Sequence, residues 1–129
     1  MNKGKITPVS LAFLLLGLAV GLMAQTADFA GTWLGKTEIP DVGVDELTLV
    51  LEKTPTGYKG KVSDTLGMLT PETELRDVQL TGNEIACSCL LADGAEVKFK
   101  MKLDGDKIIG VWEHQSGGIG TMEFARKKI

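Results

Sequence analysis

The sequence predicts an all-β domain folded as an eight-stranded antiparallel up-and-down barrel, and three features of the chain carry this prediction. From about residue 31 onward, apolar and polar residues alternate with a period of two, as in strands with one face on the core and one on solvent. Short turns rich in Gly, Asn, Asp and Pro separate these stretches. Mid-strand glycines favour the bends of a barrel over the alternative, a β-sandwich.

The first half of the barrel is predicted to contain strands at 31–39, 45–54, 57–64 and 74–81. The first strand has a mid-strand glycine, Gly35, and the second carries leucines at every other position from 47 to 51. Pro55-Thr56-Gly57 supplies the turn before the third strand. The fourth strand is expected to point Val78 and Leu80 inward and to end at the turn Gly82-Asn83.

The second half is predicted to contain strands at 84–91, 95–104, 107–114 and 120–127. Asp93-Gly94, Asp104-Gly105-Asp106 and Gly117-Gly118 are the turns between them. Each strand has an inward row of alternating residues, and these rows are Ile85, Cys87, Cys89 and Leu91, then Val97, Phe99, Met101 and Leu103, then Ile108, Gly110 and Trp112, then Met122 and Phe124. Strands joined by such tight turns lie beside their sequence neighbours.

One connection, from Asp64 to Thr73, is longer than the others and carries three apolar residues, Leu66, Met68 and Leu69. Apolar side chains in a loop must cover something or be covered. The functional interpretation is a lid over a barrel mouth; the alternative is ordinary packing against the barrel end.

Residues 1–24 are predicted to be a cleavable signal peptide. Lys3 and Lys5 precede an apolar stretch without charge, and small-residue cleavage chemistry would act at Ala24-Gln25. An uncleaved anchor would need about 20 apolar residues. Cleavage leaves a single domain, residues 25–129, and removes two lysines and no acid, so the net charge changes from −3 to −5. We expect an exported protein, periplasmic or extracellular, without a stable membrane anchor and without affinity for nucleic acid.

The tripeptide Gly31-Thr32-Trp33 at the start of the first strand and Arg126 near the end of the last resemble the calycin superfamily, which includes lipocalins, fatty-acid-binding proteins and avidin-like barrels. The resemblance implies that the tryptophan lies at a closed barrel end under the basic residue. A cation stacked on an indole contributes about 0.5 to 2 kcal/mol.

A second resemblance covers the whole mature chain. Its segments include 31–35, 47–49, 60–63, 77–78, 110–112 and 117–118. In pattern and order they are similar to the small β domain that precedes the catalytic domain of some secreted bacterial α/β-hydrolases. The resemblance implies an accessory or binding module, and it does not identify a ligand.

Cys87 and Cys89 are separated by one residue, so in a strand both point to one face with Cα atoms ~6.5 to 7 Å apart, at the limit for a disulfide. We expect both to be free and packed in the core, although two thiols near several methionines would also suit a soft metal ion. An intermolecular disulfide is the third alternative.

Catalytic chemistry has little support in the sequence. No G-x-S-x-G motif is present and His114 is the single histidine, so a triad with Ser63 and Asp64 rests on no recognisable spacing. The acidic residues around the first turn, including Asp41 and Asp45, lack a calcium-loop pattern and are expected to be solvated. We expect no enzyme activity, no metal and no cofactor.

The predicted function is therefore binding. The leading hypothesis is a small, largely apolar ligand inside the barrel; the alternative is a protein-binding accessory or inhibitor-like module that contacts an exported partner through its loops or outer face. Aromatic residues make up only 5% of the chain, which leaves room for a cavity. The candidate ligand-binding residues are Leu66, Met68, Leu69, Phe99, Met101, Trp112 and His114, and the candidate barrel-end pair is Trp33 and Arg126.

Overall fold

The structure, a computed structural model, describes residues 28–128, so the expected signal peptide lies outside the described residues. The described chain forms β1 (Gly31–Ile39), β2 (Gly43–Thr54), β3 (Gly57–Asp64), β4 (Thr73–Glu74), β5 (Arg76–Thr81), β6 (Glu84–Leu90), β7 (Glu96–Asp104), β8 (Lys107–His114) and β9 (Ile119–Arg126). Among these residues, no helix is long and apolar enough to cross a membrane.

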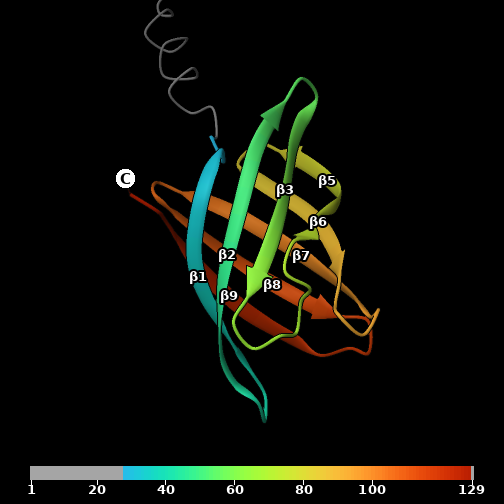
Figure 1. The fold of residues 1–129 in the computed structure, drawn as a ribbon. Helices are drawn as coiled ribbons and strands as arrows, with labels where there is room; N and C mark the ends of the chain where they lie inside the picture. Colours follow the sequence, from blue (N-terminus) through green and yellow to red (C-terminus); the bar gives the residue numbers. More distant parts are fainter. Residues whose placement is uncertain (1–27, 129) are drawn as a thin grey trace, which may run out of the picture.

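All nine strands belong to one antiparallel sheet in the order β4-β3-β2-β1-β9-β8-β7-β6-β5. Sequence neighbours pair with each other except β4 and β5, and β1 also pairs with β9, so the sheet curls into a nearly closed barrel. Figure 1 shows β1, β2 and β3 in front, crossing steeply over the strands behind them. The all-β antiparallel barrel is therefore confirmed, and the β-sandwich alternative is wrong because the strands form a single sheet.

The expected strand 74–81 is instead two strands, β4 and β5, separated by Leu75. β4 pairs with β3, whereas β5 pairs with β6, so the chain changes partner at this point. The backbone N–H of Leu75 still donates to the carbonyl of Gly60 at 2.9 Å. Between Arg76 and Gln79 the register with β6 shifts, and Asp77 has a φ of 53°. The prediction of one continuous strand was wrong because alternation does not report a change of partner.

In β5 the expectation that Val78 and Leu80 both point into the core is only partly met. Leu80 is 42% exposed, although it lies opposite the fully buried Ile85 of β6. β5 is an edge strand with a hydrogen-bonded partner on one side only, so its side chains are incompletely covered. Val78 is partly buried against the core.

One end of the barrel is closed by aromatic side chains. Trp33 and Phe29 are fully buried, and the indole Nε1 of Trp33 donates to the carbonyl of Phe29 at 2.9 Å. The backbone N–H of Phe29 donates in turn to the Tyr58 hydroxyl at 3.0 Å, and the two rings meet edge to face at 5.7 Å. Phe29 precedes the first strand and did not stand out in the alternating pattern.

Arg126 covers this closed end. Its guanidinium carbon lies 4.2 Å from the centroid of the Trp33 ring. Nη1 donates to the carbonyl of Ala30 at 2.7 Å, and Nη2 donates to the carbonyl of Asp28 at 2.9 Å. The last strand thus fixes the segment that leads into the first, through stacking and two charge-assisted hydrogen bonds.

Candidate functional site

A cavity of about 260 Å³ occupies the barrel interior at the end opposite Trp33. Its walls are mainly apolar side chains, and the polar side chains among them are Thr37, Asp45, His114 and Ser116. The apolar part is lined by Ile39, Pro40, Leu47, Leu49, Val62, Met68, Leu69, Leu75, Leu91, Val97, Phe99, Met101, Trp112, Ile119, Met122 and Phe124. An apolar cavity with a few polar groups is the usual form of a small-molecule site.

Six of the seven candidate ligand-binding residues line this cavity. Met68 and Leu69 come from the segment 64–73, while the other four, Phe99, Met101, Trp112 and His114, come from β7 and β8. Leu66 does not line the cavity and is 42% exposed.

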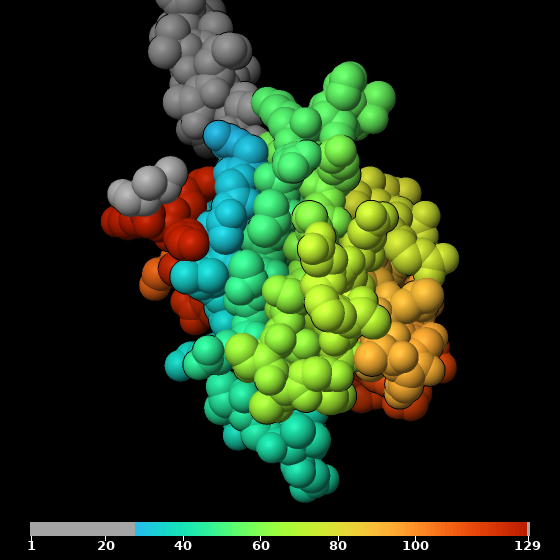
Figure 2. Space-filling view, viewed as in Figure 1, coloured from blue at the N-terminus to red at the C-terminus, as the bar shows by residue number. Residues whose placement is uncertain are grey.

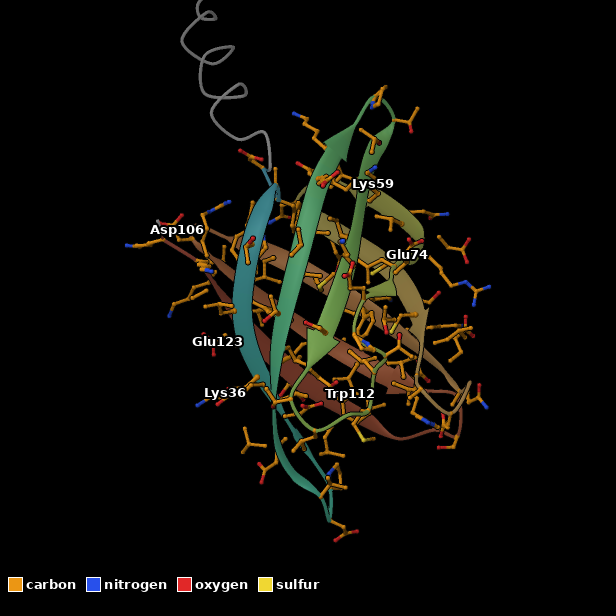
Figure 3. The ribbon with its side chains drawn as sticks, in the orientation of Figure 1. Lys36, Lys59, Glu74, Asp106, Trp112 and Glu123 are labelled. Carbon is orange, nitrogen blue, oxygen red and sulfur yellow. The ribbon has the colours of Figure 1, made fainter. Side chains whose placement is uncertain are left out.

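Trp112 is positioned by a glycine and a threonine. It lies opposite Gly120 of β9, where a Cβ atom would overlap the indole, so the ring lies flat over the backbone of β9. Its Nε1 donates to Oγ1 of Thr37 in β1 at 2.8 Å, and that hydroxyl donates to the carbonyl of Thr121 at 2.6 Å. Figure 3 shows the ring near the 64–73 segment, which contributes to the same cavity.

Two carboxyl groups hold the 64–73 segment in place. Asp45 accepts from the backbone N–H groups of Thr65 at 3.1 Å and of Leu66 at 3.0 Å. Asp64 accepts from the N–H groups of Met68 at 2.8 Å and Leu69 at 3.2 Å. The segment is therefore held along its first half by side chains from both strands at the open end of the β2–β3 hairpin.

The segment also contacts the turn after β6. The backbone N–H of Ala92 donates to the carbonyl of Met68 at 2.8 Å. In Figure 2 the segment (yellow-green) lies beside this turn (orange) on the surface of the molecule. The segment thus bridges two hairpins and places Met68 and Leu69 against the cavity.

Asp45 corrects the expectation of a solvated acidic loop. Its side chain is buried, with 2% of the residue exposed, and it lies opposite Thr37 in the β1–β2 register. Burial and a hydrogen bond shared with Asp64 raise the pKa of Asp45 from 3.8 to about 6, while the N–H groups of Leu66 and Thr65 oppose the rise. The signal that could have found it is positional, since Asp45 continues the inward row of Leu47, Leu49 and Leu51.

The groups considered for catalysis have other partners. Nδ1 of His114 accepts from the backbone N–H of Ser116 at 3.0 Å and lies 2.8 Å from the Ser116 hydroxyl. Asp64 is engaged by the backbone of Met68 and Leu69. No hydrogen bond among residues 28–128 joins Ser63, Asp64 and His114 into a relay.

Cys87 and Cys89 are free and buried in the core, on the same inner row as Ile85. Burial raises the pKa of Cys87 to about 12, with a contribution from Cys89, and burial raises the pKa of Cys89 to about 11. Both groups are therefore thiols rather than thiolates at neutral pH. Within the described part of the chain, no group of three or more His, Cys, Asp or Glu side chains is placed to hold a metal ion.

Comparison with known proteins shows the fold but no family. No protein family model matches the chain, and no curated protein matches it. A redesigned β-barrel has a TM-score of 0.61 at 14% identity, covering 77% of this chain and 91% of the designed one. A de novo designed fluorescence-activating β-barrel has a TM-score of 0.53 at 20% identity, covering 77% of this chain and 94% of the designed one. The chain is thus similar in fold to small β-barrels.

Proposed function

We propose that this protein is a non-enzymatic binding module that holds a small, largely apolar molecule in its barrel and acts outside the cytoplasm after removal of residues 1–24. The observation that carries the proposal is the cavity of about 260 Å³ between the closed aromatic end and the 64–73 segment. If side chains filled the barrel completely, its interior would have no space for a ligand.

The cavity is large enough for a specific ligand. A water molecule takes up about 30 Å³ of liquid volume. The cavity of about 260 Å³ therefore has room for about nine groups of the size of a water molecule. This corresponds to a ligand of about eight to ten non-hydrogen atoms. The apolar walls would provide affinity by burial, at about 25 cal/mol per Å² of apolar surface.

A matched pair of variants tests this proposal. Val97→Phe adds a ring inside the cavity, because Val97 is 5% exposed and lines its wall. Val111→Phe makes the same change at a β8 position that is 48% exposed and does not line the cavity. We expect small apolar probes to bind the wild type and Val111→Phe equally and to bind Val97→Phe at least tenfold more weakly. Equal binding to both variants, with both folded, would remove the cavity as the site.

The alternative, a protein-binding module, has one observation in its favour. Val42, Val44 and Ile119 are 57%, 53% and 72% exposed. Val42 is in the β1–β2 turn, Val44 is near the start of β2, and Ile119 begins β9. Native mass spectrometry of protein recovered from its own host separates the two functions. A bound small mass supports the ligand, and a bound polypeptide supports the partner. The mass of the mature chain also tests cleavage before Gln25.

A further inference from the structure

The cavity wall contains a carboxyl group but no lysine or arginine to pair with it. The ionisable side chains that line it are Asp45 and His114, and neither lysine nor arginine contributes to its wall. The lysine nearest to Thr37 in sequence, Lys36, lies on the outer face beside Glu123 (Figure 3). An anionic ligand such as a fatty acid would meet a buried carboxyl group without a lysine or arginine to balance it.

Asp45 and Asp64, the two carboxyl groups that hold the 64–73 segment, have no salt-bridge partner in the described part of the protein. The ion pairs within residues 28–128 are Lys59–Glu52, Lys61–Glu72, Lys107–Glu123 and Arg126–Asp106. None of them involves Asp45 or Asp64. Asp45 is 2% exposed, so water screens its charge poorly.

The position of Asp45 gives the ligand a direction. Asp45 lies opposite Thr37 in the register and accepts from the backbone of the 64–73 segment, so it is at the mouth of the cavity. The walls deeper in the barrel, such as Leu49 and Phe124, are apolar and buried. A ligand therefore fits with its apolar body inward and its polar end at the mouth.

We propose that the ligand is an apolar amine, a molecule of eight to ten non-hydrogen atoms whose protonated amino group lies at the mouth against the carboxyl group of Asp45. This proposal rests on the proposed function and specifies the class of ligand for the same cavity. An ammonium group there supplies a cation and donates hydrogen bonds to Asp45, which has no lysine or arginine beside it in the cavity wall. The remaining polar neighbours, Thr37 and Ser116, provide hydroxyl groups for its other protons.

Three probes of matched length test the class of ligand. Octylamine, octanol and octanoate have similar apolar bodies and differ in the charge of one end; at pH 7.5 the amine is cationic and the acid is anionic. Their dissociation constants are measured by titration calorimetry with the full mature chain. We expect octylamine to bind at least tenfold more tightly than octanol, and octanoate to bind most weakly.

Two variants assign the preference to Asp45. Asp45→Asn keeps the size and the acceptor oxygen of the side chain and removes its charge; octylamine and octanol should then bind within threefold of each other. Glu46→Gln, at the adjacent exposed position, should leave the tenfold preference unchanged. Thermal unfolding of each variant verifies that it is folded.

The outcomes separate this proposal from the proposed function. Octanol or octanoate binding as tightly as octylamine, or a preference for octylamine that survives in Asp45→Asn, would overturn the amine while leaving the cavity as a binding site. Failure of all three probes to bind would overturn both.

Discussion

The buried carboxyl group of Asp45 leads to a counterintuitive prediction for stability. Asp45→Asn should make the protein more stable at neutral pH, although it removes a side chain that holds the 64–73 segment. Because the pKa of Asp45 is raised from 3.8 to about 6 in the folded protein, the native state binds this proton more tightly than the unfolded state does. The associated stability is fully present below pH 3.8 and is lost as the pH rises through about 6. Asparagine stays neutral throughout and still offers an oxygen to the N–H groups of Thr65 and Leu66.

The size of the effect follows from the difference in proton affinity. A tenfold change in proton affinity corresponds to about 1.4 kcal/mol, so a pKa of about 6 against 3.8 corresponds to about 3 kcal/mol at most. Asp45 is 2% exposed, which keeps solvent screening small. The asparagine amide is expected to donate to Asp64 and so to replace the hydrogen bond that the two carboxyl groups share.

The assay is urea unfolding of wild type and Asp45→Asn between pH 4 and pH 7.5. Taking the difference between the two proteins at each pH cancels groups that titrate in both. We expect the stability of the wild type relative to the variant to fall by about 1 to 3 kcal/mol across this range. Glu46→Gln should give a difference that does not vary with pH. A flat difference for Asp45→Asn, or one that rises with pH, would refute the reasoning.

Three further predictions concern the closed end, the core and the mouth. Trp33→Ala should cost about 3 to 5 kcal/mol in urea unfolding, because the ring is fully buried; a cost under about 1 kcal/mol would show that it does not close the barrel. Cys87 and Cys89 should not react with a thiol reagent at pH 8 until urea unfolds the protein, and fast labelling of the native state would contradict their burial. Gly120→Ala should cost about 1 to 3 kcal/mol and shift the fluorescence of Trp112, whose ring the new methyl group would displace; an unchanged spectrum and stability would contradict the close packing.

Most of the fold could be predicted because apolar and polar residues alternate along each strand. β7 and β8 follow their apolar rows to within a residue of the expected bounds, since inward and outward faces differ along the whole strand. The change of partner at Leu75 could not be predicted, because pairing with β3 or with β6 leaves the same alternating pattern. Leu80 is exposed for a related reason, since an edge position is a property of the whole sheet.

The candidate site was predicted in part. Met68 and Leu69 stood out as apolar residues in a loop, and Phe99 and Trp112 as members of inward rows. Asp45 was missed because its burial depends on a segment that begins about twenty residues later and folds back over it. The bond from Trp112 to Thr37 joins residues 75 positions apart, which no local pattern reports.

The pairing of β1 with β9 sets the order in which the domain can form. The hairpins between sequence neighbours close short loops and can form early, whereas Trp33 and Arg126 come into register only when the two ends of the domain meet. Until then β1 and β9 each have an open edge, and the aromatic end has no cover. We therefore expect neither half of the barrel to be stable alone and the domain to fold as one cooperative unit, completed by the pairing of β9 with β1.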